Sequence, residues 1–171
     1  MRKQNGFSLI ELLIVVAIIL IIAAIAIPNL MRAKMSANDA SAAQSLRQIS
    51  TAEIAYVGSY PTVGYAATLT ALGGVSPCVP VVAGACLLDN NLATNGGGNG
   101  KSGYSFTSVG AASAGSLVND EFFAAATPLN SMTGTRAYCS VEDTVVRLQP
   151  AGTITAVPDY NTCAALNAMS N

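Results

Sequence analysis

The sequence lacks the side chains that most often carry catalysis and nucleic-acid binding. Its 171 residues include no histidine and no tryptophan, and only 10% are charged. Without histidine, no Ser–His or Cys–His nucleophile pair can form. The formal net charge of -1 provides no basic field for nucleic acid, so no nucleic-acid site is identifiable. We therefore expect no enzymatic activity and no cofactor.

Glycine and proline are nearly absent from the first third of the chain. No glycine occurs between Gly6 and Gly58, and Pro28 is the only proline in that stretch. This composition predicts one helix over 7–57, about 75 Å long at 1.5 Å per residue. Because proline removes a hydrogen bond and clashes with the preceding turn, we expect Pro28 to kink the helix or unwind it locally.

The first half of this helix, residues 7–27, is apolar on all sides. Only Ser8 and Glu11 are polar in this segment of 21 residues. As a helix it would extend for about 31 Å, which matches the hydrocarbon core of a bilayer. A carboxylate inside such a segment is unfavourable, and it therefore indicates a function for Glu11. The alternative is a Glu11 side chain that reaches back to the cytoplasmic interface.

The basic residues around the apolar segment predict its orientation. Arg2 and Lys3 precede it, and no basic residue follows until Arg32. By the positive-inside tendency, the N-terminus stays in the cytoplasm and the rest of the chain is exported. An ordinary secretory signal cleaved near 23–26 is the alternative, but such a signal has a shorter apolar region.

The residues around the start of the apolar segment resemble a known processing motif. The segment 6–12, Gly-Phe-Ser-Leu-Ile-Glu-Leu, is similar to that of type IV pilins and type II secretion pseudopilins. The resemblance implies that a prepilin peptidase cuts between Gly6 and Phe7 and removes the leader 1–6. It also implies that the same enzyme methylates the new α-amino group of Phe7.

The resemblance further implies a life cycle for the chain. The precursor would sit in the inner membrane through one span, with its N-terminus cytoplasmic and residues 7–27 as the membrane half of the helix. An inner-membrane assembly platform would then add it to a homopolymer of the same subunit, an extracellular pilus filament. Glu11 corresponds to the family's fifth mature residue and would pair with the Phe7 amine of a neighbouring subunit. Removing one partner of a buried ion pair costs about 3–5 kcal/mol, enough to make assembly depend on Glu11.

The second half of the helix changes to an amphipathic pattern. Leu46, Ile49 and Tyr56, with Ala42 and Ala52 nearby, follow helical spacing on one face. More polar positions are marked by Arg32, Lys34, Asp39 and Arg47. We expect the apolar face to pack on a small globular head.

The rest of the chain predicts a small antiparallel sheet, and the fold class is α+β and pilin-like. Residues 58–102 are rich in Gly, Asn, Pro and Thr, correspond to the family's variable αβ-loop, and should contain short turns or helical pieces. The region 103–152 should form the sheet, and 153–171 a tail tied back by a disulfide. Four runs have strand character: 103–109, 121–127, 136–141 and 144–148.

Four cysteines lie in the second half of the chain: Cys78, Cys86, Cys139 and Cys163. An even number in a small exported domain is typical of disulfides, and four cysteines allow three pairings. A zinc site is the alternative, but the short paired spacing of zinc ribbons is absent. Our prediction is Cys78–Cys86, which closes a short loop, with Cys139–Cys163, which links the third strand to the tail.

Two further motifs have some of the features of binding sites. The segment 95–102 nearly matches a phosphate-binding loop. Such a loop requires a buried strand before it and a helix after it, but here a turn-like stretch precedes and a strand-like one follows. The adjacent acidic pairs 120–121 and 142–143 could bind Ca²⁺, but the Trp-containing calcium motif of pseudopilins is absent. We therefore expect no metal site.

The function predicted from the sequence is a structural subunit of a type IV pilus. A type II secretion pseudopilin or a minor pilin is the alternative within the family. A membrane-tethered binding module that never polymerises is an alternative of a different class. Glu11 distinguishes them, because a tether has no need of a carboxylate within the membrane.

Overall fold

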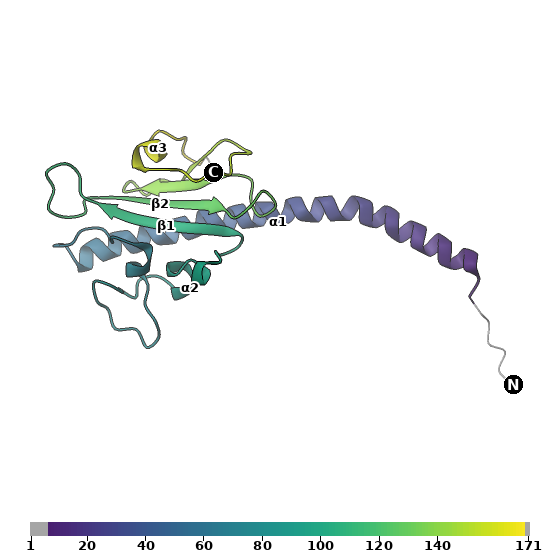
Figure 1. The fold of residues 1–171 in the computed structure, drawn as a ribbon, viewed down its shortest axis with the longest axis horizontal. Helices are drawn as coiled ribbons and strands as arrows, with labels where there is room; N and C mark the ends of the chain where they lie inside the picture. Colours follow the sequence, from purple (N-terminus) through teal and green to yellow (C-terminus); the bar gives the residue numbers. More distant parts are fainter. Residues whose placement is uncertain (1–6, 170–171) are drawn as a thin grey trace. The chain divides into compact units, whose positions relative to one another are not determined.

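The computed structural model describes residues 7–169, so the predicted leader 1–6 lies outside the described residues. The chain divides into two compact units, one ending at Lys34 and one beginning at Met35. Helix α1, Leu9–Ser59, contributes to both units (Figure 1). The sequence predicted this helix over 7–57, and the structure places both of its ends two residues later.

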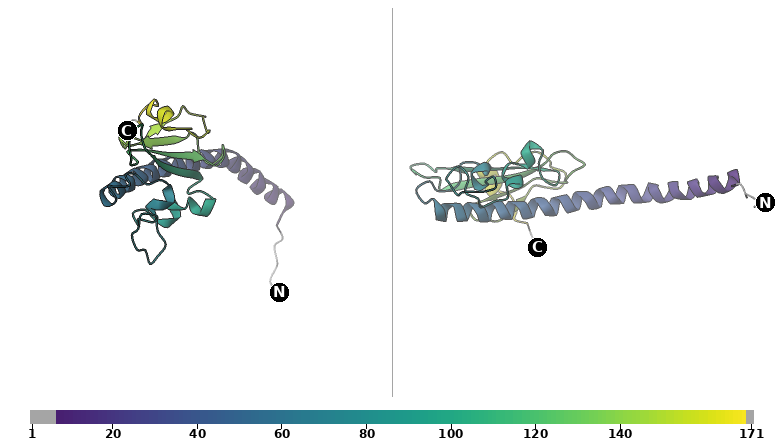
Figure 2. Two further views of the ribbon diagram at one scale, coloured as in Figure 1. Left: turned by 60° about the vertical axis from the view of Figure 1, so that its left-hand side comes forward. Right: turned by 90° about the horizontal axis from the view of Figure 1, so that it is seen from below.

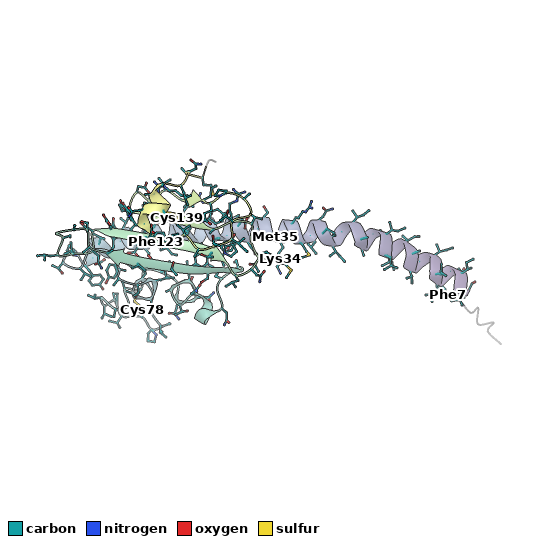
Figure 3. All side chains as sticks on the ribbon, turned by 45° about the horizontal axis from the view of Figure 1, so that its top comes forward. Phe7, Lys34, Met35, Cys78, Phe123 and Cys139 are labelled. Carbon is teal, nitrogen blue, oxygen red and sulfur yellow. A yellow bond between two sulfur atoms is a disulfide. The ribbon has the colours of Figure 1, made fainter. Side chains whose placement is uncertain are left out.

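In the first unit, α1 exposes apolar side chains all around its axis (Figure 3). Its helical hydrogen bonding continues through Pro28. One missing N–H removes a single bond from a long helix, and the neighbouring turns keep the segment helical. The local unwinding expected at Pro28 is therefore not seen in the described helix, and a kink in an assembled filament stays a prediction.

In the second unit, which we call the head, the amphipathic face of α1 is buried as its spacing predicted. Ala42, Leu46 and Ile49 are fully buried, and Ala52 and Tyr56 are nearly so. They belong to one core cluster that also contains residues of the sheet. This buried stripe fixes which side of the helix faces the rest of the head.

The sheet has four antiparallel strands in the order β1-β2-β3-β4. The strands are β1 Tyr104–Ala111, β2 Glu121–Pro128, β3 Tyr138–Val141 and β4 Arg147–Leu148. Each overlaps one of the four runs that the sequence predicted, although the third and fourth are shorter. The long helix and the antiparallel sheet confirm the predicted α+β class.

One face of the sheet packs against the part of α1 that belongs to the head (Figure 2). On that face, Phe106 of β1 lies opposite Ala126 of β2, and Ser108 lies opposite Ala124. These four residues and Tyr104 of β1 are buried. Alanine on β2 leaves room for the larger side chains of β1 and of the helix. The Ser50 hydroxyl of α1 also donates to the Ser140 hydroxyl of β3.

The segment between α1 and the sheet contains short helical pieces, as its composition predicted. They are η1 Leu69–Leu72, α2 Asn90–Ala93 and η2 Gly96–Gly98. Backbone bonds hold the segment together: Ala85 N–H donates to the Ala71 carbonyl at 2.8 Å, and Leu87 N–H donates to the Leu72 carbonyl at 2.8 Å.

The tail returns to the sheet at its β4 edge. Helix α3, Tyr160–Ala164, packs against β3. Beyond α3, Leu148 N–H donates to the Asn167 carbonyl at 3.2 Å, and Met169 N–H donates to the Val146 carbonyl at 2.8 Å. The tail therefore covers the edge that a two-residue β4 would leave open.

Candidate functional site

The N-terminal end of α1 holds the predicted processing and assembly residues. Glu11 Oε2 accepts a hydrogen bond from the Ser8 N–H at 2.9 Å, and the Ser8 carbonyl accepts one from the Leu12 N–H at 3.3 Å. A glutamate three residues after a serine, bonded to the serine N–H, forms one half of a capping box. Glu11 thus stabilises the first turn of its own helix. The sequence analysis missed this role, although the Ser-x-x-Glu spacing signals it.

The surface that follows is apolar and has no cover in the single chain. Phe7 is 82% exposed, Leu9 80% and Leu20 63%. Among the described helices, only α1 is long and apolar enough to cross a membrane. A contiguous apolar surface of this kind marks a contact with lipid or with other protein chains.

The site residues that the sequence singled out lie at one end of this surface. Gly6 is outside the described residues, so the geometry of the predicted cleavage site is not given by the structure. Phe7 and Glu11 are four positions apart, which places them about one helical turn from each other along the chain. A new α-amino group on Phe7 would therefore arise near the one carboxylate of the apolar segment.

Comparison with known proteins identifies this end of the chain. Residues 1–27 match the family model described as the prokaryotic N-terminal methylation motif. This match confirms the predicted resemblance to the prepilin-type N-terminal motif over these residues. The type IV wide pilus major component PilA4 of Thermus thermophilus is 64% identical over 39 residues. The match covers 23% of this chain and 30% of the relative, and no solved structure matches.

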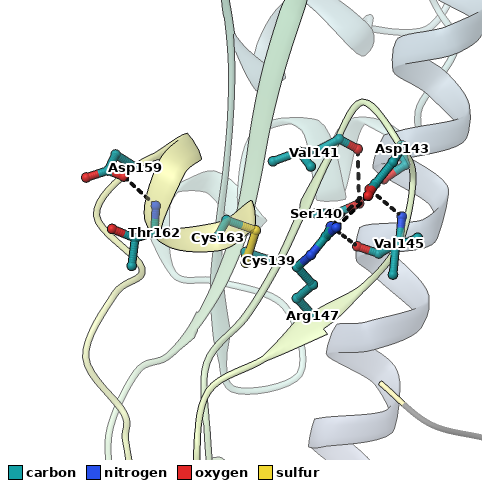
Figure 4. The surroundings of a disulfide bond; sticks show 10 residues. Cys139, Ser140, Val141, Asp143, Val145, Arg147, Asp159, Thr162 and Cys163 are labelled. Carbon is teal, nitrogen blue, oxygen red and sulfur yellow. Dashed lines mark hydrogen bonds and ion pairs between the residues drawn. A yellow bond between two sulfur atoms is a disulfide. The ribbon is translucent and has the colours of Figure 1, made fainter. Parts of the chain in front are cut away.

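Two disulfides occur in the head. Cys78 is bonded to Cys86, and Cys139 of β3 is bonded to Cys163 of α3, with Cα–Cα distances of 6.0 Å in both pairs (Figure 4). This is the pairing that the sequence predicted. The first disulfide closes a loop of the αβ segment, and the second attaches the tail to the sheet.

One buried acid that was not predicted from the sequence, Glu53, lies in the middle of the amphipathic stripe. Its side chain is fully buried. Oε2 accepts from the Ala66 N–H at 2.9 Å, and Oε1 accepts from the Ser108 hydroxyl at 2.7 Å. Glu53 is four residues after Ile49 and three before Tyr56, and this spacing could have revealed that it faces the core.

We expect Glu53 to make the stability of the head depend on pH. Burial, partly offset by the bonds from Ser108 and Ala66, raises the pKa of Glu53 from 4.5 to about 6. A raised pKa stabilises the fold fully below the unfolded value, and this contribution is lost as the pH rises through the folded value. The free energy of unfolding should fall by about 1.5 kcal/mol between pH 4.5 and pH 6.5.

Denaturant unfolding of the full-length protein in detergent at a series of pH values measures this change. Glu53→Gln should remove most of the slope, while Glu121→Gln, at a half-exposed position, should leave it unchanged. The chain has no histidine, and hydrogen bonds lower the pKa values of Asp120, Asp143 and Asp159, so these three carboxyls do not contribute to the slope in this window. A slope that persists in Glu53→Gln would contradict the assignment.

A second acid of α1, Asp39, also bonds to the head. Its Oδ1 accepts from the Tyr104 hydroxyl at 2.5 Å and from the Thr135 N–H at 3.1 Å, and its Oδ2 accepts from the Thr135 hydroxyl. Burial and the bond to Asp39 raise the pKa of Tyr104 well above its usual range, so the phenol remains a donor. The sequence analysis grouped Asp39 with the polar positions of α1, and the structure shows that it faces the head.

The other motifs from the sequence have structural roles in the described part of the chain. In the segment resembling a phosphate-binding loop, α2 precedes and β1 follows, and the Asn95 side chain accepts from the Phe106 N–H at 2.8 Å. Asp120 accepts from the Ser113 N–H at 2.6 Å. Among residues 7–169, no group of three or more acidic, Cys or His side chains could hold a metal ion.

Proposed function

We propose that this chain is a major subunit of a type IV pilus, made as a precursor that is anchored in the inner membrane by the first half of α1. The observation that carries the proposal is the apolar surface of α1, exposed on all sides from Phe7 onward and containing Glu11 as its one carboxylate. The N-terminal methylation motif over the same residues supports it. The Thermus relative, named as a major component of a wide pilus, favours a major subunit over a minor one.

In this proposal, the apolar surface of α1 contacts lipid in the membrane and other subunits in the filament. In the bilayer, lipid covers the apolar helix, and the carboxylate stays near the cytoplasmic end of the span. In a filament, equivalent helices of other subunits cover the same surface. Because both environments cover the apolar surface, neither leaves it exposed to water.

A pseudopilin remains the second candidate within the family, and abundance in surface filaments separates the two. Sheared extracellular filaments should contain this protein as the dominant band. If the band is missing and deletion of the gene instead stops secretion of periplasmic enzymes, the chain is a pseudopilin. If the protein stays in the membrane and deletion affects neither filaments nor secretion, it is a tethered module.

We expect the mature subunit to begin at methylated Phe7. Removal of residues 1–6 takes away Arg2 and Lys3, which leaves six basic and nine acidic side chains and changes the side-chain charge from -1 to -3. Intact mass and N-terminal sequencing of the purified protein measure both the cut and the methyl group. A terminus near Ala26, or retention of Met1, would contradict this prediction.

A further inference from the structure

The head carries a basic groove beside the β1 edge of the sheet. The groove has a volume of about 440 Å³ and lies between the solvent side of α1 and the αβ segment. We define it by the cations Arg47 and Lys101 and the polar side chains Gln44, Gln48 and Thr51. In the part of the chain that the structure describes, neither cation has an ion-pair partner.

The groove also contains one acidic residue, Asp89, whose carboxylate caps helix α2. Asp89 accepts from the Asn91 N–H at 2.9 Å and from the Leu92 N–H at 3.3 Å, and so caps α2. Its charge is thereby directed at backbone amides. Arg47 and Lys101 consequently leave the groove with an excess of positive charge.

An acidic edge lies on the other side of the sheet, around α3. We define it by Glu121, Glu142, Asp143 and Asp159, grouped about Tyr160. Its single cation, Arg147, pairs with Asp143 at 2.5 Å, so this edge carries a net charge of -3. Glu121 also lines an apolar groove of about 410 Å³ formed with Phe123 and Val157.

The two patches are separated by the sheet within one head. Lys101 of the basic groove forms an isolated backbone bridge with Tyr104, the first residue of β1. The acidic edge lies beside β3 and the tail that follows β4. In Figure 1, α2 and α3 mark these opposite flanks of the strands. The basic groove and the acidic edge of one chain therefore cannot contact each other, but the groove of one copy can contact the edge of another.

We infer that the basic groove of one head binds the acidic edge of a neighbouring copy in the filament. The inference rests on the proposed function. A contact between two different patches is heterologous, and repeating it generates an open helical array instead of a closed dimer. Opposite charge on the two surfaces aligns the copies and disfavours other arrangements, because like-charge contacts are costly.

Charge reversal tests the contact in cells that express the full-length chain. Arg47→Glu should lower the yield of sheared filaments about tenfold, since it places a carboxylate against the acidic edge. Glu121→Lys should do the same, and its side chain forms no hydrogen bond in the described structure that the change would break. The double variant R47E/E121K should restore most of the yield, because the charges are exchanged between the two surfaces.

The control is Ala151→Glu, which adds a negative charge to an exposed turn outside both patches and should leave the yield unchanged. Membrane levels of each processed variant show whether it folds. Wild-type yield in R47E, or a double variant that is stable in the membrane but does not recover, would overturn the contact alone. If wild-type cells form no filaments from this chain, the proposed function fails and the contact with it.

Discussion

Filaments are expected to be absent, or reduced at least about a hundredfold, when Glu11 is replaced by alanine. In the proposed filament, the carboxylate neutralises the α-amino group of a neighbouring Phe7 among apolar helices. Removal of one partner of a buried ion pair costs about 3–5 kcal/mol. Since every 1.4 kcal/mol is a factor of ten, each subunit contact would weaken by more than a hundredfold.

The structure also shows a second role for Glu11, as a cap of its own helix, and a glutamine variant separates this role from that of the charge. Glu11 also accepts the Ser8 N–H, and loss of this cap would weaken the first turn of α1. Glutamine can fill the same capping position but has no charge. Glu11→Gln should therefore fail to assemble if the charge matters, and should assemble normally if the cap alone matters.

Filament yield is measured by shearing, and the membrane-bound pool provides the control for expression. Both variants should appear in the membrane at mature length, because Gly6 and Phe7 are unchanged. Normal filaments from Glu11→Gln would show that Glu11 acts only on its own helix. A variant that stays at precursor length would show that Glu11 acts in processing.

Local patterns explain why the main elements of this fold could be predicted. Helix α1 follows from the absence of glycine over about 50 residues and from its apolar periodicity. Strands β1 and β2 follow from the runs 103–109 and 121–127, each of seven residues bounded by turns, and the structure has eight residues in each strand. The Cys78–Cys86 pair spans only eight residues, so its loop could be read directly from the chain.

Residues whose partners lie far away in the sequence could not be assigned in this way. Glu53 bonds to Ser108, 55 residues later, and Asp39 bonds to Thr135, 96 residues later. An acid on an apolar stripe is stable only if distant donors are brought to it, and the spacing alone does not name them. The length of β4 is a further example: the predicted run 144–148 is a strand only at Arg147–Leu148, where the distant tail bonds to it through the Asn167 carbonyl.

The Cys139–Cys163 disulfide is expected to contribute more to stability than any other covalent constraint in the head. It closes a loop with a sequence separation of 24, and chain-entropy arguments give about 3–4 kcal/mol for such a loop. Both cysteines are fully buried in a small apolar cluster with Val141 and Val157. Helix α3 has five residues, too few to be stable alone, so the disulfide holds the tail on the sheet.

The double variant C139A/C163A should therefore unfold with a free energy about 3–4 kcal/mol lower than that of the wild type. The matched control is C78A/C86A, whose loop has a sequence separation of only 8 and should cost about 2.5 kcal/mol by the same argument. Denaturant unfolding of the full-length chains in detergent without reductant measures both. Alanine avoids placing an unpaired hydroxyl in the cluster, so the difference reports mainly on the crosslink. Equal losses in the two variants, or a larger loss in C78A/C86A, would show that the attachment of the tail depends on its backbone bonds to β4 and not on the disulfide.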